Sequence, residues 1–401
     1  MSSAESSSPI KKVVLGSGKI RYRFVVDVGR KPDGGRRQLT ITKNTKKEAQ
    51  TEYARIVAEK ASGTYIAPNK MTVGEWIDQW LAKKAEDLEV TTMHNYETTL
   101  QRAKDVIGHI RLQELTEEQV EDMVTYLLTS GRTRGSKAGT GLDVTTVDMT
   151  LSRLKDVLNR AVTKRLVALN VASEVTIPRR ARKASRKQKA ELVPWNVAEV
   201  RTFVKGMKGD RLYAPLLLSL MGLRPAEVCG IRWEDIDMEA ATLMVANTRT
   251  MMGNKTVVEK DTKSMAGERG LPQPDPVKEA LKTFRILQAK EKLALGADYA
   301  DSGYVVVNEI GEVLTIRQLR VRAYKIMDEL GLRRVRLYDA RASCLTYLAN
   351  QGVPEHILAR WAGHTSGRTT KRWYVKPDVE DLRGAATTWE GLHGEAAEGQ
   401  A

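Results

Sequence analysis

The chain has 401 residues and carries 65 Lys and Arg against 50 Asp and Glu, a formal net charge of +15. This length predicts two or three domains, and so large a positive excess favours a polyanionic partner, which we expect to be nucleic acid. No apolar run approaches the roughly 20 residues that a membrane span needs. The N-terminus has no apolar signal segment, and the two cysteines, Cys229 and Cys344, form no metal-like cluster. We therefore expect a cytoplasmic protein without a membrane span.

The first segment, residues 1–66, predicts a small sheet followed by a helix. Apolar and charged residues alternate from Ile20 to Val28, a Pro-Asp-Gly-Gly turn follows at 32–35, and a second strand is expected over 36–42. Thr45 can cap the helix, whose inward residues are expected to be Ala49, Tyr53, Ile56 and Val57. We expect the basic face of the sheet to bind DNA, and a merely solvated face is the alternative. The expected DNA contacts are Arg21, Arg23, Arg36 and Arg37.

Residues 70–177 predict a domain of four helices. Thr72 caps the first helix, and the second runs over about 91–107. Thr116 and Gln119 form a capping box that opens the third, and the fourth spans about 144–166. A basic, glycine-rich loop lies at 130–141. Because cations recur on its loops, we expect this domain to clamp DNA, and a plain helical spacer is the alternative.

Residues 178–190 predict a basic interdomain linker. The stretch 178–189 holds seven cations and no acid, which marks a domain boundary. Such a run is either a solvated linker or a linker that also follows a DNA backbone. The residues expected to contact phosphates are Arg179, Arg180, Arg182 and Lys183.

The segment 191–385 mixes helices with one hairpin, predicted as a strand over 241–252, a Gly-Asn turn and a second strand over 255–259. The whole chain is thus expected to be α+β and multidomain, with a C-terminal tail at 386–401. Five side chains follow in fixed order within 191–385: Arg224, Lys263, Arg341, His364 and Tyr374. Two guanidiniums match the oxygens of a phosphodiester, and a tyrosine hydroxyl can attack its phosphorus.

In the order and spacing of these five side chains, residues 191–385 resemble the catalytic domain of tyrosine recombinases, the phage integrase family. Residues 70–177 resemble that family's core-site-binding domain, and residues 1–66 are similar to the arm-site-binding domain of integrases from phages and conjugative elements. The resemblance implies that Arg224, Arg341 and His364 hold the phosphate, that Lys263 is the general acid and that Tyr374 is the nucleophile. Because cationic side chains stabilise the charge, neither a metal nor another cofactor is expected.

One position departs from the family pattern. The family's His-x-x-Arg box begins here with Tyr338, three residues before Arg341. A tyrosine donates a hydrogen bond but carries no positive charge at neutral pH. We include Tyr338 among the expected site residues as a phosphate-site donor, and a packing role is the alternative. Glu227 and Asp235 are expected to be structural partners of arginines.

The resemblance implies an integrase that cleaves and rejoins double-stranded DNA through a 3′-phosphotyrosine. It further implies integration and excision of a phage or mobile element through a Holliday junction, by a homo-tetramer on core-type and arm-type attachment sites. A host DNA-bending factor, a directionality factor and a prokaryotic, nucleoid-associated setting belong to the same expectation. Tetramers would exchange a segment within 376–401, with Trp389 and Leu392 as anchors. The alternatives are a DNA-binding regulator inactivated by Tyr338 and a type IB topoisomerase.

Overall fold

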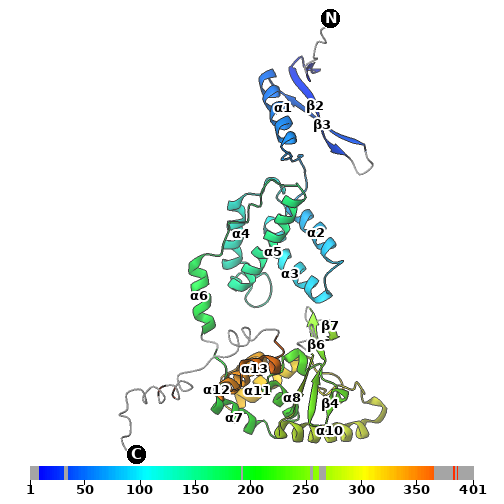
Figure 1. Cartoon of the computed structure of the whole chain (residues 1–401), viewed down its shortest axis with the longest axis vertical. Coiled ribbons are helices and arrows are strands. Elements are labelled where there is room, and N and C mark those ends of the chain that lie inside the picture. Colours follow the sequence, from blue (N-terminus) through cyan, green and yellow to red (C-terminus); the bar gives the residue numbers. More distant parts are fainter. Residues whose placement is uncertain are drawn as a thin grey trace, which may run out of the picture. The chain divides into compact units, whose positions relative to one another are not determined.

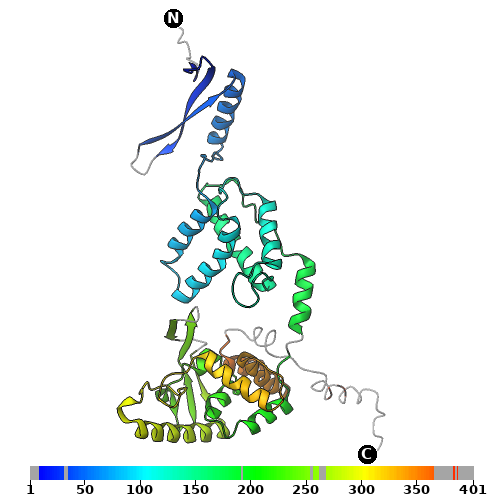
Figure 2. The same cartoon turned by 180° about the vertical axis from the view of Figure 1, so that it is seen from behind.

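The structure, a computed structural model, describes residues 9–30, 35–190, 193–252, 256–261 and 268–364, together with Arg383 and Ala386. The chain divides into two compact units, Met1–Lys187 and Gln188–Ala401. Both are drawn in Figure 1 and, from behind, in Figure 2. Helices dominate and the sheets are small, so the predicted α+β, multidomain class is confirmed. Within the described ranges, no helix combines the length and the apolar content of a membrane span.

The first unit begins with a three-stranded antiparallel sheet of order β1-β2-β3, and one helix lies along a face of it in both views (Figure 1, Figure 2). These elements are β1 Ile10–Val14, β2 Ile20–Arg30, β3 Arg36–Lys43 and α1 Lys46–Ala61. Thr45 caps α1 as predicted, because its hydroxyl accepts a hydrogen bond from the Glu48 N–H at 3.2 Å. Phe24 and Ile56 are buried between sheet and helix, whereas Val57, predicted to face inward, is 44% exposed.

Four helices follow in the same unit. They are α2 Val73–Lys84, α3 Val90–Ile107, α4 Glu117–Thr129 and α5 Val144–Thr163. Capping boxes open α2 at Thr72 and α4 at Thr116, as their sequences predict. The Trp76 indole N–H donates to the Val157 carbonyl at 3.0 Å and so joins α2 to α5 across the core. The fourth helix ends a few residues before the expected position, because Arg165 has a φ of 55° and leaves the helical conformation.

The basic stretch after this bundle is helical. It forms α6, Arg179–Ala190, a conformation that the prediction of a basic linker had not specified. Arg182 donates from Nη2 to Asp148 Oδ1 on α5 at 2.8 Å, which ties the first turns of α6 to the bundle. Arg179, Arg180 and Lys183 are exposed and leave their charge in solvent.

The second unit packs helices around a small sheet. Its helices are α7 Val197–Gly206, α8 Tyr213–Leu220, α9 Pro225–Val228, α10 Asp275–Leu295, α11 Ile316–Glu329, α12 Leu337–Asn350 and α13 Glu355–Ala362, with 3-10 turns η1 Trp233–Asp235 and η2 Gly296–Asp298. Its strands are β4 Ile236–Asp237, β5 Thr242–Val245, β6 Asn247–Met252, β7 Thr256–Asp261 and β8 Arg269–Pro272.

The predicted single strand over 241–252 is wrong. β5 pairs with β4 and β8, whereas β6 pairs only with β7 in a separate antiparallel ribbon. The strand changes partners where β6 passes Gly230. The two backbones approach closely at this point, and a Cβ on Gly230 would lie 2.8 Å from the Asn247 carbonyl oxygen. This close approach fixes the start of β6 against the loop that follows α9.

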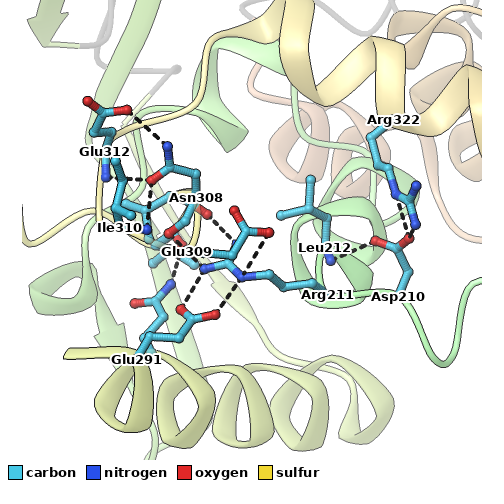
Figure 3. A network of polar contacts seen from close by, with 12 residues as sticks. Asp210, Arg211, Leu212, Glu291, Asn308, Glu309, Ile310, Glu312 and Arg322 are labelled. Atoms are coloured by element: carbon cyan, nitrogen blue, oxygen red, sulfur yellow. Dashed lines mark hydrogen bonds and ion pairs between the residues drawn. The ribbon is translucent and has the colours of Figure 1, made fainter. Parts of the chain in front are cut away.

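A polar network holds the outer elements of this unit together (Figure 3). The Arg211 guanidinium binds both carboxylate oxygens of Glu291 on α10, each at 2.7 Å. The same group donates to the Val307 carbonyl at 2.6 Å and to the Asn308 carbonyl at 2.8 Å. Beside it, Arg322 of α11 pairs with Asp210. The Arg211–Glu291 pair is bidentate and mostly buried, which makes it one of the stronger kinds of ion pair and stiffens this part of the fold.

Candidate active site

Arg224 stands at the start of the short helix α9. Pro225 follows at the first helical position, where its fixed φ favours helix initiation. The Arg224 N–H donates to Glu227 Oε2 at 2.8 Å, and its Nη1 donates to Glu227 Oε1 at 2.5 Å. The arginine side chain remains 31% exposed while the carboxylate is 1% exposed. Glu227 therefore orients a guanidinium that still reaches solvent.

Arg341 lies on α12 and is fully buried, with 0% of its surface exposed. Its Nη1 donates to the Gly222 carbonyl at 2.7 Å, and its Nη2 donates to the Ala362 carbonyl. Its Nη2 also lies 2.8 Å from His364 Nε2. These contacts bring the ends of α8, α12 and α13 to one place, so the two predicted arginines and the predicted histidine form one cluster.

The C-terminal end of α13 is capped by arginines. The last carbonyls of a helix lack helical donors and carry partial negative charge, so cations stabilise them. Arg269 Nε donates to the Trp361 carbonyl at 2.7 Å, Arg341 to that of Ala362, and Arg224 Nη2 to that of Gly363 at 3.1 Å. Three successive carbonyls thus receive three guanidiniums, each from a different element.

His364 follows directly on this helix end. Gly363 adopts a left-handed φ of 64° and its N–H donates to the Arg360 carbonyl at 3.1 Å. The His364 N–H donates to the Ala359 carbonyl at 2.9 Å and closes the turn. The backbone bonds and the three guanidiniums together fix the ring beside Arg341.

Burial, followed by the positive charges of Arg341, Arg224 and Arg269, lowers the pKa of His364 to about 4. The imidazole is therefore neutral near pH 7. Because a guanidinium has no lone pair, Arg341 must donate to Nε2, and the ring proton is on Nδ1.

Arg269 is a site residue that sequence reasoning did not select. It lies on β8, is 1% exposed, and donates from Nη1 and Nη2 to the two oxygens of Glu227 at 3.2 and 3.1 Å. Burial alone would raise the pKa of Glu227, but the Arg269 bonds and the Arg224 charge hold it below its usual value. Its only sequence signal is its place six residues after Lys263.

Of the other predicted residues, some fall within the described part of the chain and two do not. Tyr338 begins the first turn of α12 and is 42% exposed, unlike the fully buried Arg341 one turn later. Lys263 and Tyr374 lie outside the described residues. As predicted, Glu227 is an arginine partner, and Asp235 accepts the Arg232 N–H at 2.9 Å. Among the described residues no group of His, Cys, Asp or Glu could hold a metal ion.

The predicted DNA contacts all belong to the N-terminal sheet and α6. Strand alternation puts Arg21 and Arg23 on the face opposite the buried Phe24, together with their antiparallel neighbours Val13 and Thr42. Arg36 is exposed, and the side chain of Arg37 lies outside the described residues. The structure leaves the role of these arginines a prediction.

Chemically, the cluster presents preorganised donors with an excess of positive charge. Arg224 keeps part of its planar guanidinium exposed, and such a group matches the non-bridging oxygens of a phosphodiester. Arg341 is buried behind it and donates to Gly222, Ala362 and His364. The single carboxylate, Glu227, is engaged by Arg224 and Arg269. Donors held in this way stabilise charge as it develops, without reorganising during the reaction.

Known proteins match both parts of the chain. Residues 197–381 match the Phage integrase family, and residues 72–177 match the Phage integrase SAM-like domain. A relative from Caldanaerobacter subterraneus subsp. tengcongensis, named tyrosine recombinase XerC-like, is 26% identical over 90% of this chain and 93% of its own length. An integrase from Streptomyces ambofaciens is 23% identical over 93% of each chain.

Solved structures share the fold. The integrase of the transposon Tn1549, in complex with transposon right-end DNA, matches with a TM-score of 0.61 and 18% identity over 80% of this chain and 100% of its own. A lambda integrase tetramer bound to a Holliday junction matches with a TM-score of 0.50 and 16% identity over 94% of this chain and 100% of its own. With its two family matches, its relatives and its fold in agreement, the chain belongs to the tyrosine recombinase family of site-specific DNA recombinases.

Proposed function

We propose that this recombinase is the integrase of a phage or other mobile element, with Tyr374 as its nucleophile. The observation that carries the proposal is the convergence of Arg224, Arg341 and His364 at the capped end of α13. Each strand is cut in turn, and exchange passes through a Holliday junction within a tetramer. The lambda integrase tetramer on a Holliday junction supports this assembly by likeness of fold.

In the proposed mechanism, Arg224 and Arg341 bind the two non-bridging oxygens of the scissile phosphate. Arg224 meets the phosphate with its exposed edge, while Glu227 holds the other edge. Neutral His364 supplies a further hydrogen bond from its ring. Each such donor typically contributes roughly 3–4 kcal/mol to transition-state stability when tested by deletion.

The bond changes balance without an external energy source. The Tyr374 hydroxyl gives its proton to solvent as its oxygen attacks phosphorus, the bond from phosphorus to the 5′ oxygen breaks, and Lys263 protonates the leaving oxygen. The 3′-phosphotyrosine keeps the energy of the phosphodiester. A 5′ hydroxyl from another strand then attacks it and returns a proton to Lys263, while the tyrosine oxygen leaves and takes a proton from solvent.

DNA recognition is proposed for three parts of the chain. Residues 1–66 bind arm-type sites through Arg21, Arg23, Arg36 and Arg37, and residues 70–177 bind core-type sites. Residues 178–190, the basic linker that forms α6, follow the DNA backbone. The exposed side chains of Arg179, Arg180 and Lys183 contact its phosphates, as does Arg182, which is also partly engaged by Asp148. Residues 191–385 carry the catalysis. The DNA complex of the Tn1549 integrase supports this division by likeness of fold. Host DNA-bending and directionality factors, and a prokaryotic, nucleoid-associated setting, complete the proposal.

The test is a covalent trap. The DNA flanking the gene supplies the attachment site, which is nicked so that the short strand released by cleavage diffuses away. The wild-type protein is expected to form a DNA adduct that survives denaturation, and Tyr374→Phe is expected to bind the same DNA without forming it. Arg224→Ala is expected to slow adduct formation by about 100- to 1,000-fold.

Two outcomes would point elsewhere. If the wild-type protein binds the site and never forms the adduct, the chain is a DNA-binding regulator on the same scaffold, which the replacement of histidine by Tyr338 favours. If it relaxes any supercoiled plasmid as a monomer, it is a type IB topoisomerase. Both results contradict the integrase.

A further inference from the structure

One carboxylate in the candidate active site is shared by two arginines. Glu227 accepts from Arg224 Nη1 at 2.5 Å, and its two oxygens accept from Nη1 and Nη2 of Arg269 at 3.2 and 3.1 Å. The exposed fractions of the three side chains differ greatly. Arg224 is 31% exposed, whereas Arg269 and Glu227 are 0% and 1% exposed. Of the two guanidiniums, a ligand that arrives from solvent can therefore reach Arg224 and not Arg269.

Arg269 is fixed from more than one side. It begins β8, where it is the register partner of Val245 on β5. Its Nε donates to the Trp361 carbonyl near the end of α13 at 2.7 Å. Because its Nη atoms bind Glu227 on α9, one rigid guanidinium joins the sheet to both helices. Its charge thus stays at a constant position beside the carboxylate.

Glu227 depends on this partner for its charge. Burial raises the pKa of a carboxyl group, because a charged carboxylate loses the solvation of water. In Glu227 the bond and charge of Arg269, followed by the charge of Arg224, overcome burial and hold the pKa below its usual value. The carboxylate is therefore ionised near pH 7.

The formal charges of these three groups leave one positive charge. Arg224 and Arg269 contribute one positive charge each, and ionised Glu227 contributes one negative charge. Without Arg269, Arg224 and Glu227 would form a neutral pair. Such a pair attracts a phosphate less, because the carboxylate repels it, and this repulsion is stronger in a partly buried site than in water.

We propose that Arg269 is a positioning residue that neutralises Glu227, so that Arg224 keeps its positive charge for the scissile phosphate. Arg269 touches neither the substrate nor the reacting atoms. It acts through Glu227, whose carboxylate orients Arg224 and would otherwise cancel its charge. This inference rests on the proposed function, and specifically on Arg224 as a phosphate-binding residue.

The test is a charge-balance rescue in the full-length protein. Single-turnover formation of the DNA adduct is measured for Arg269→Met, Glu227→Gln and the double variant. Arg269→Met is expected to be roughly 10- to 100-fold slower than the wild type, because the neutral pair weakens one phosphate donor. Adding Glu227→Gln removes the negative charge as well and is expected to regain at least about fivefold. If Arg269 had only a structural role, losing a second buried partner would not speed up the reaction.

His364 provides a second measurement that needs neither DNA nor a nucleophile. Burial and the charges of Arg341 and Arg224 are the larger causes of its low pKa, while Arg269 also lowers it and Glu227 raises it. In Arg269→Met the midpoint is therefore expected to move from about 4 toward 6.5. In the double variant it is expected to return, because one cation and one anion have both been removed. NMR of ring-labelled histidine measures each midpoint.

Arg211 supplies the matched control. Like Arg269, it binds both oxygens of a mostly buried carboxylate, that of Glu291, and it also donates to backbone carbonyls in the same unit. Arg211→Met is expected to lower the urea midpoint of unfolding. The rate of adduct formation by the folded protein and the His364 midpoint are expected to stay unchanged.

An Arg269→Met rate equal to that of the wild type would overturn the inference. A slow rate that Glu227→Gln does not raise would also overturn it, because Arg269 would then serve only to cap α13 and to pack. If Arg269→Met does not fold, the double variant decides, since it no longer buries the carboxylate. A rate within about tenfold of the wild type then supports the inference, and a slower one contradicts it.

These failures leave the recombinase function standing, because the wild type still forms the adduct in each of them. Absence of any adduct in the wild type would instead defeat the proposed function. The His364 titration would still show whether Arg269 neutralises Glu227, and an unchanged midpoint in Arg269→Met would contradict that.

Discussion

His364 is the residue whose charge the site controls most strongly. Its ring accepts a hydrogen bond from a guanidinium and lies near two more positive charges, so protonation would add a cation to a cluster of cations. The family role of this position needs only a donor, and neutral imidazole retains one at Nδ1. The site thus keeps a hydrogen-bond donor while avoiding a further buried charge.

We predict that His364 in the DNA-free protein titrates near pH 4, well below the ordinary value of 6.5. The measurement is NMR of ring-labelled histidine, with the His364 signal identified among the five histidines by its loss in His364→Gln. A midpoint close to 6.5 would show that Arg341 does not donate to the ring in solution.

The same shift has a consequence for stability. His364 takes up a proton below about pH 6.5 in the unfolded chain but only near pH 4 in the folded chain. The free energy of unfolding therefore falls as the pH drops from about 6.5 to about 4. After discounting for solvent screening of a half-exposed ring, the loss between pH 7 and pH 5 is roughly 1 kcal/mol. His364→Gln is expected to lack this part of the pH dependence.

Sequence reasoning selected three residues that the fold brings together and missed a residue that holds one of them. Arg224, Arg341 and His364 stand in recognisable motifs and come together as expected. Arg269 has no such signal, because its role arises from its contact with Glu227, 42 positions away. Local spacing carries no information about such partners, and only the folded chain shows them.

At the scale of elements, the turn between α8 and α9 decides where Arg341 sits. Gly222 has a φ of +100°, a conformation that L residues rarely adopt. A Cβ at this position would lie 3.3 Å from Cys344 Sγ and 3.6 Å from the Trp361 indole nitrogen. The Gly222 carbonyl is also the acceptor for Arg341 Nη1. A displacement of this turn would therefore also displace Arg341.

We predict that Gly222→Ala lowers the free energy of unfolding by about 1–2 kcal/mol. It should also raise the activation free energy of adduct formation by at least the same amount. Gly209→Ala is the matched control, since nothing lies within 4 Å of its Cβ and its φ is not positive. Urea unfolding and single-turnover cleavage measure the two effects. Equal behaviour of the two variants would show that the turn is not strained and does not position Arg341.

The sequence predicted the ends of the helices in the first unit better than the ends of the strands in the second. The helices of the first unit were predicted closely because capping residues such as Thr72 and Thr116 mark their starts. The strand over 241–252 was predicted as one because alternation continues through Ala246, although its two halves pair with different strands. Alternation reports a strand and gives no information about its partner. The sequence therefore did not show that β6 and β7 form a ribbon separate from the β4-β5-β8 sheet.

At the scale of the whole molecule, the hydrophobic cores are separate and unequal. The sheet and α1 share a small core around Phe24, Val26, Ala49 and Ile56. The helices α2 to α5 and the second unit each have a much larger one. Phe24 adds an edge-to-face contact with Tyr53 at 5.4 Å, but a core this small supplies little stability. Cooperative unfolding of the entire chain as one step is therefore not expected.

We predict that calorimetry of the full chain shows more than one transition, with the sheet and α1 unfolding first. Phe24→Ala removes a 1% exposed ring from the smallest core and should lower only that transition, since a buried phenylalanine typically contributes about 3–5 kcal/mol. Deleting residues 1–66 should abolish the transition and leave the others in place, because Gln113 holds the next segment to the helices through the Ala67 carbonyl at 3.0 Å. A single transition that Phe24→Ala shifts as a whole would mean that the cores unfold together. The N-terminal segment would then be part of the recombinase body, and its proposed role as a separate arm-site reader would lose its physical basis.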